Sequence, residues 1–302
     1  MSRLRDVGMY TALALGWGTT FAAVEVALAA FPPLVLMAVR YYLAGAVLLG
    51  YVATTGHDWR PSTTGDLIGI AGGSVFWIAL GNGVWFIGQA LTTSVLSGLM
   101  AGLIPIATVV FSWQLLPEER LTPTSLVGLL VSFAGALLIV RPPGGFVVDS
   151  GFLGKAILLV GVAGSGLGSV LIRRAAGSIT NTARTGWAVL FGAIIIHGLA
   201  LLVGQGWPAE VTTSLGAVLY LALPATVVAY TCFFDLLSRN PAIDVTLVTY
   251  LVPIIPAITG RTLFGEPLTA TMISGFVVVL VGFLLLKHQE LRRELTRYRP
   301  GR

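Results

Sequence analysis

The chain is a succession of apolar runs of about 18 to 25 residues, separated by short breaks rich in proline, glycine or charge. A helix of that length crosses a hydrocarbon core roughly 30 Å thick, because each residue adds about 1.5 Å. Only 10% of the 302 residues are charged and 56% are hydrophobic, whereas a soluble domain carries about 25% charged residues. Too few polar groups remain to cover a surface in water. The sequence therefore predicts an all-α integral membrane protein.

Proline, glycine and charge clusters set the limits of ten predicted transmembrane helices. The longest polar connection, Arg141 to Gly151, separates two groups of five. We therefore expect one repeat over residues 1–142 and a second over 143–302, which ends in a basic tail. The predicted spans are 8–30, 33–54, 67–88, 93–115 and 123–140, followed by 154–172, 184–204, 213–237, 242–260 and 270–287.

The basic residues predict how the chain is oriented, because Lys and Arg are retained on the cytoplasmic side. With the N-terminus inside, fourteen basic residues face inward, only Arg141 and Lys155 lie in outer loops, and Arg40 and Arg261 fall within spans. We expect a multi-pass protein of the cell membrane with both termini in the cytoplasm. The basic residues lie singly or in pairs outside the C-terminal cluster, so nucleic acid is not an expected partner.

Two further features limit the chemistry. The first apolar run is too long for the apolar segment of a signal peptide and is expected to be a retained helix. The single cysteine, Cys232, lies inside an apolar run, which excludes an intramolecular disulfide and a cysteine-based metal site. No ATP-binding loop is present in the sequence, and we expect no cofactor, no metal and no catalytic residues.

The last two helices of each half resemble one another. With a gap of one residue, Pro105, Glu119, Leu121, Gly128 and Gly135 align with Pro253, Glu266, Leu268, Gly275 and Gly282. Because each repeat has five spans, an odd number, the two copies must be inverted relative to one another. Glu119 is then expected at the inner face and Glu266 at the outer face. Inverted repeats are the architecture with which many carriers alternate between two similar conformations.

Four motifs occur in order along these spans: Trp17-Gly18-Thr19-Thr20-Phe21, Pro33 with Arg40, Pro105 with Glu119-Arg120-Leu121, and Pro253 with Glu266-Pro267-Leu268. Together they resemble the EamA-type proteins of the drug/metabolite transporter superfamily over nearly the whole chain. The resemblance implies a ten-helix carrier of small solutes with a central cavity between the repeats. The chain departs from many relatives at Glu25, where they carry Lys, and its sixth span lacks a counterpart of Trp17-Gly18.

Glu25 and Arg40 are the strongest candidates for chemistry, because ionisable groups within a span cost about 2.5 to 3.5 kcal/mol. Both lie at a similar depth, on either side of the outer turn at Phe31-Pro32-Pro33. We expect them to face one another beside the substrate path, with Arg40 attracting a carboxylate or phosphate and Glu25 binding an amine or a proton. The alternative is a structural ion pair that joins the first two helices.

Other polar and aromatic residues form a second group of candidates. Six are expected to line the substrate cavity, and the alternative for them is the membrane interface or a bridge between helices: Trp17, Thr20, Asn82, Trp85, Tyr230 and Tyr250. The alignment places Asn82 opposite Tyr230. Pro105 and Pro253 each remove a helix hydrogen bond, and Glu119 and Glu266 are expected to accept backbone N–H groups at helix ends or to act in gating.

The sequence favours a secondary transporter that exports a small metabolite, an amino acid or a related organic solute, with protons as the coupling ion. One alternative is a membrane hydrolase, since Ala163-Gly164-Ser165-Gly166 resembles the rhomboid protease motif and His197 lies one span later. Ala163 replaces the glycine expected two residues before the serine, however. The other alternative is a channel, which inverted repeats make less favourable than alternating access.

Overall fold

A computed structural model describes residues 2–55, 58–115, 123–140, 150–175, 177–208, 210–240, 245–286 and 288. Within these ranges the chain is helical and contains no strand. Seven helical segments are long and apolar enough to span a membrane, and three shorter apolar helices bring the described set to ten. The predicted all-α membrane fold is confirmed.

The helices of the first half begin at residues that suit a helix N-terminus. Pro33 occupies the first turn of the second span. Thr63 and Asp66 form a reciprocal capping box at the start of the third, and Thr93 caps the fourth. The elements are α1 (Ser2–Leu28), α2 (Pro33–Thr54), α3 (Thr64–Ala71), η1 (Gly72–Val84), α4 (Trp85–Ala90), α5 (Ser94–Ala101), α6 (Ile104–Leu115) and α7 (Pro123–Val140).

The second half repeats this organisation. Thr180 caps the seventh span of the chain. Its elements are α8 (Ser150–Arg174), α9 (Asn181–Leu202), η2 (Thr212–Ser214), α10 (Leu215–Ala222), η3 (Leu223–Val228), α11 (Ala229–Arg239), η4 (Leu247–Tyr250), α13 (Ile254–Leu263) and α14 (Ala270–Leu286).

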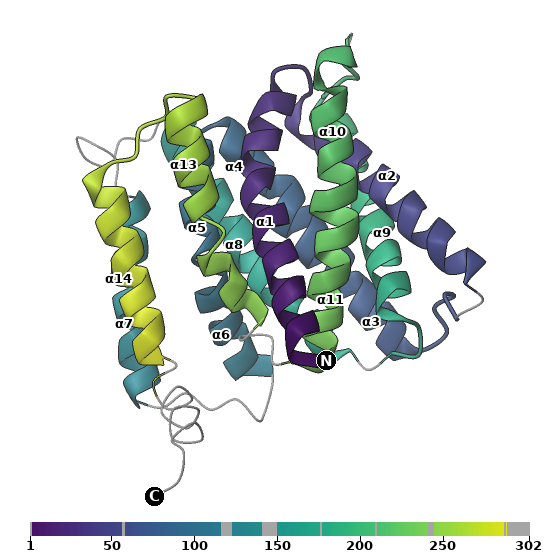
Figure 1. Cartoon of the computed structure of the whole chain (residues 1–302), viewed down its shortest axis with the longest axis horizontal. Coiled ribbons are helices and arrows are strands. Elements are labelled where there is room, and N and C mark those ends of the chain that lie inside the picture. The colour runs from purple at the N-terminus through teal and green to yellow at the C-terminus, as the bar shows by residue number, and fades with distance from the viewer. Residues whose placement is uncertain are drawn as a thin grey trace, which may run out of the picture.

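Polar contacts at one end of the bundle show that the two halves are inverted. Arg5, near the start of α1, contacts Asp235, near the end of α11, at 2.9 Å, and both elements lie at the lower end of Figure 1. Arg173, at the end of α8, donates to the carbonyl oxygen of Ser238 at 3.1 Å. The first helix of the second half therefore ends at the face where the first helix of the chain begins. We call this end of the bundle the N-terminal face.

The α7–α14 pair is packed through the glycines that aligned in the sequence. A Cβ added at Gly128 would lie 2.5 Å from the carbonyl oxygen of Gly282, and one added at Gly135 would lie 2.6 Å from that of Gly275. The repeat alignment matches Gly128 with Gly275 and Gly135 with Gly282. It therefore converts each of these contacts into the other, as a two-fold relation between the repeats requires. Without a hydrophobic driving force in lipid, small residues let helix backbones approach closely. The remaining faces of α7 expose large apolar residues, such as Leu130 at 64% exposed, to the lipid.

We expect Gly135→Val to destabilise the protein by about 1–3 kcal/mol, the usual cost of overpacking. The added side chain would meet the carbonyl oxygen of Gly275 and the amide nitrogen of Val279, both at 2.6 Å. The measurement is the free energy of unfolding in mixed detergent micelles. Gly50→Val in α2 is the matched control, because a Cβ at Gly50 meets nothing within 4 Å. Equal losses in both variants would contradict this account of the interface.

Candidate functional site

Four spans are interrupted at equivalent places in the two halves. The third span contains the π-helical segment η1, and the eighth contains the π-helical segment η3, which includes Pro224. The fourth span breaks between α5 and α6 beside Pro105, and the ninth breaks between η4 and α13 at Pro253. Both prolines thus mark the breaks that the sequence indicated. Irregular backbone at membrane depth is tolerated where it is buried or lines a cavity.

A small cavity of about 50 Å³ lies at these interruptions. Ala101 and Ile104 flank the break in the fourth span, while Thr249 precedes the break in the ninth and Val252 lies within it. Among the candidates from the sequence, six line the cavity: Trp17, Thr20, Arg40, Asn82, Trp85 and Tyr230.

Side chains of the π-helical spans donate hydrogen bonds to backbone carbonyl oxygens of the same span. The amide of Asn82 donates to the carbonyl oxygen of Trp77 at 2.7 Å, five residues earlier. In the other half, the hydroxyl of Thr226 donates to the carbonyl oxygen of Leu221, also at 2.7 Å and five residues earlier. The two π-helical segments therefore use the same device to satisfy their backbone.

Arg40 is directed at the eighth span. Its side chain is 1% exposed. Its Nε donates to the hydroxyl of Thr226 at 2.6 Å, and its Nη2 donates to the carbonyl oxygen of Ala225 at 3.2 Å. The remaining polar contact is from Nη1 to the sulfur of Met37 at 4.0 Å. All three partners are neutral.

The expected pairing of Glu25 with Arg40 is wrong. The carboxylate of Glu25 accepts a hydrogen bond from Nε2 of Gln89 at 3.2 Å, and the same amide donates to the carbonyl oxygen of Phe21. Glu25 thus faces α4, while Arg40 faces η3. The two residues do lie at similar depth, but similar depth does not fix the direction in which a side chain leaves its helix.

Two candidates lie away from the cavity. Glu25 is on the α4 side of α1, and Tyr250 packs against Phe283 of α14 with ring centroids 4.8 Å apart. Neither is among the residues that line the cavity.

Glu266 caps a helix of the opposite repeat. Its carboxylate accepts hydrogen bonds from the backbone N–H groups of Ser94 at 3.0 Å and Val95 at 2.8 Å, and from the hydroxyl of Ser94 at 2.9 Å. These groups form the N-terminus of α5, where a negative charge is stabilising. Glu119, its counterpart, lies outside the described residues.

An aromatic layer separates the cavity from the N-terminal face. Trp17 of α1, Trp77 of η1 and Phe233 of α11 contact one another, with centroid distances of 5.5 Å between the two indoles, 5.0 Å from Trp17 to Phe233 and 4.3 Å from Trp77 to Phe233. On α11, Phe233 lies between Tyr230, which lines the cavity, and Asp235 at the N-terminal face. The layer therefore covers that side of the cavity.

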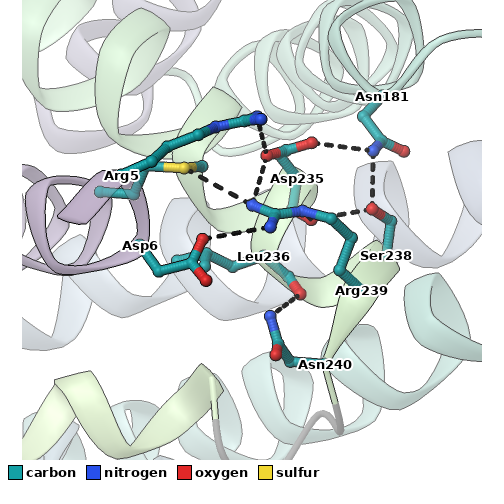
Figure 2. Close-up of polar contacts among 9 residues, drawn as sticks. Arg5, Asp6, Asn181, Asp235, Leu236, Ser238, Arg239 and Asn240 are labelled. Atoms are coloured by element: carbon teal, nitrogen blue, oxygen red, sulfur yellow. Dashed lines mark hydrogen bonds and ion pairs between the residues drawn. The ribbon is translucent and has the colours of Figure 1, made fainter. Parts of the chain in front are cut away.

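A charged network lies at the N-terminal face, and Figure 2 shows its contacts. Asp235 contacts Arg5 at 2.9 Å and Arg239 at 2.7 Å, and Arg239 also contacts Asp6 at 3.1 Å. Asn181 at the start of α9 donates to Ser238 at 2.7 Å. The spacing of Asp235 and Arg239 predicts only a local pair. The structure shows that the pair also joins α11 to α1, and we call these four charged residues the N-face ion network.

Several residues at the cavity were not predicted from the sequence, among them Trp77, Phe21, Phe86 and Ser165. Helical spacing gave no reliable signal for Trp77, because it lies inside the π-helical segment η1, where the period of 3.6 residues does not hold. Asp66 was also missed. Besides capping α3, it accepts the backbone N–H groups of Ser178 at 2.8 Å and Ile179 at 3.2 Å, and so joins α3 to the α8–α9 turn.

The residues considered for a hydrolase are not brought together. Ser165 is buried on α8 at the cavity. His197 is exposed on α9, and its Nδ1 lies 3.2 Å from the hydroxyl of Tyr42. The structure therefore contains no Ser165–His197 pair.

Comparison with known proteins places this architecture in a family. The model of the EamA-like transporter family matches residues 7–141 and again residues 152–287. Protein PecM of Dickeya dadantii is 27% identical over 99% of this chain and 97% of its own length. The uncharacterized inner membrane transporter YedA of Escherichia coli is 26% identical, over 91% of this chain and 89% of its own.

Two more similarities bear on name and fold. A probable amino-acid metabolite efflux pump of Salmonella typhimurium is 25% identical over 89% of this chain and 90% of its own. A crystal structure of a protein 21% identical superimposes with a TM-score of 0.69, over 96% of this chain and 99% of that one, which shows the common fold. The chain is a multi-pass membrane transporter and belongs to the EamA-like transporter family.

Proposed function

We propose that the protein is a secondary transporter that moves a small organic solute out of the cytoplasm by alternating access. The observation that carries the proposal is the cavity at the four interrupted spans, which is covered on one side by the aromatic layer and the N-face ion network. Repeats of opposite orientation allow a second conformation, in which the cavity is covered on the opposite side and open toward the N-terminal face. We further propose repeats at residues 1–142 and 143–302, with the N-terminal face in the cytoplasm.

Export is supported by the name of the Salmonella relative, an efflux pump. The charge bias supports the orientation, because the N-terminal face carries Arg5, Arg173, Arg184 and Arg239. With this orientation, the structure corresponds to a carrier whose cytoplasmic gate is closed.

Carrier activity predicts counterflow, in which unlabelled solute inside proteoliposomes drives accumulation of labelled solute. We expect Thr249→Phe to reduce the counterflow rate at least tenfold, because its ring would fill the cavity that Thr249 lines. Thr262→Phe on exposed α13 surface is the matched control and should retain the rate. The panel contains labelled amino acids, organic acids, nucleosides and organic cations. Flux down a gradient without counterflow would indicate a channel and contradict the proposal.

The N-face ion network is proposed as the cytoplasmic gate, and Asp235→Asn removes both ion pairs of that carboxylate. Partly exposed pairs contribute about 0.2–1 kcal/mol each, so losing two of them should shift the equilibrium by about twofold to thirtyfold toward the cytoplasm-open state. The readout is labelling of Ser165→Cys, in a Cys232→Ala background, by an impermeant thiol reagent applied to the cytoplasmic side.

Arg174→Gln is the matched control for this gate. Arg174 is exposed at the same face and forms none of the three ion pairs of the described residues. With Arg174→Gln added, the cysteine at position 165 should be labelled at the same rate as in the Ser165→Cys, Cys232→Ala protein without it. If Asp235→Asn also leaves the rate unchanged, the network is not a gate.

We propose protons as the coupling ion and Glu25 as their carrier. Glu25 is half-buried, lies beside Gln89 and is within electrostatic reach of the Glu266 carboxylate. Glu25→Gln should abolish the stimulation of transport by an imposed pH gradient while counterflow continues, because exchange needs no net proton movement. Glu210→Gln, at an exposed loop, is the matched control. Unchanged stimulation in Glu25→Gln would exclude Glu25 as the carrier.

A further inference from the structure

The charge of Arg40 has no counter-charge in the described protein. The three ion pairs of the described residues all lie in the N-face ion network. Arg40, 1% exposed, donates to the hydroxyl of Thr226, the carbonyl oxygen of Ala225 and the sulfur of Met37. Its guanidinium carbon also lies 5.1 Å from the centroid of the Tyr41 ring, which is neutral as well. A guanidinium stays protonated in proteins. A buried, uncompensated cation favours any anion that reaches it.

The cavity beside Arg40 has the polarity of an anion site. Among the described residues that line it, Arg40 is the one charged side chain, and none is acidic. Glu25, the acidic group of the neighbouring helix, contacts Gln89 instead. An ammonium group in this cavity would meet a positive charge and no carboxylate. The site therefore disfavours cations and gives a zwitterion no partner for its amine.

Unpartnered hydrogen-bond donors add to this preference. The indole N–H of Trp17 is buried and has no acceptor in the described structure. The indole N–H of Trp77 is also buried without an acceptor in the described structure. Both rings line the cavity. Buried donors without acceptors are costly, so an incoming acceptor group satisfies them together with the free N–H groups of Arg40.

The walls fit a flat, apolar body. Phe21, Trp85 and Phe86 line the cavity with the two indoles. Aromatic side chains pack well against a ring of a ligand, in offset-stacked or edge-to-face arrangements. The indole N–H of Trp85 is already bonded to the hydroxyl of Ser97 at 2.6 Å, so Trp85 contributes surface rather than a donor.

We propose that the substrate is a small organic monoanion, a carboxylate carried on a planar and largely apolar body, without a compensating ammonium group. The carboxylate lies against Arg40 and the indole N–H of Trp17, and the body packs on the aromatic walls. This inference rests on the proposed transport function and specifies its substrate class.

Three probes with one body and different charges test the proposal: phenylpropanoate, phenylalanine and phenethylamine. Binding to the detergent-purified full chain is measured by isothermal titration calorimetry at about pH 8, where the carboxylates are ionised. We expect phenylpropanoate to bind about tenfold or more tightly than phenylalanine, and phenethylamine to show no binding. Equal or tighter binding of phenylalanine or phenethylamine overturns the proposal.

Three variants locate the binding. Arg40→Gln should weaken phenylpropanoate binding about tenfold or more, because a hydrogen-bonded charge is lost. Arg40→Lys keeps the charge but loses the fork of donors, and Trp17→Phe keeps the ring but loses the N–H; each should weaken binding about threefold to tenfold. If Arg40→Gln does not fold, the affinities of Arg40→Lys and Trp17→Phe for phenylpropanoate test the proposal. Arg261→Gln, an exposed arginine of α13, is the control and should bind as the parent does.

The outcomes separate this inference from the transport proposal. If phenylpropanoate binds as expected but gives no counterflow, the anion site stands and the transport proposal fails. If phenylalanine binds more tightly and shows counterflow, transport stands and the substrate class proposed here is wrong. Unchanged affinity in both Arg40→Lys and Trp17→Phe also overturns the anion site.

Discussion

Lipid offers no hydrogen-bond partners, so every backbone group freed by an interrupted helix must be satisfied inside the protein. This constraint organises the centre of the molecule. Asn82 and Thr226 each bond the carbonyl oxygen five residues earlier, and Arg40 reaches the carbonyl oxygen of Ala225. The interruptions that create the cavity thus require polar side chains beside it. Two of these three side chains, Asn82 and Arg40, also line the cavity and contribute to its polarity.

The duplication supplies these interruptions in matched pairs, and it was largely visible in the sequence. Ten apolar runs predicted the ten helical segments, and Pro105 and Pro253 marked the two breaks. The aligned glycines proved to be the α7–α14 interface, where Gly128 meets Gly282 and Gly135 meets Gly275. Such features could be predicted because spacing, proline chemistry and residue size act locally along a helix.

Contacts between helices were harder to predict. Depth along a span placed Glu25 and Arg40 at one level, but their directions depend on how α1 and α2 rotate against their neighbours. A π-helical segment adds a residue to a turn and so changes which residues share a face. Sequence periodicity alone could not show that Trp77 joins Trp17 and Phe233. Asp66 was missed because its partners, Ser178 and Ile179, are 112 and 113 residues away.

In the proposed cycle, the two faces would be held by different interactions. The N-terminal face is closed where α1 meets α11, and the contact carries the N-face ion network. Inversion relates this pair to α8 and the third span, where α4 and α8 meet through Gly88 and Gly154. A Cβ at Gly88 would lie 2.8 Å from the carbonyl oxygen of Gly154. One closure thus depends on charge, which salt screens, and the other on close backbone packing, which salt does not affect. Raising the ionic strength should therefore favour opening at the N-terminal face over opening at the opposite face.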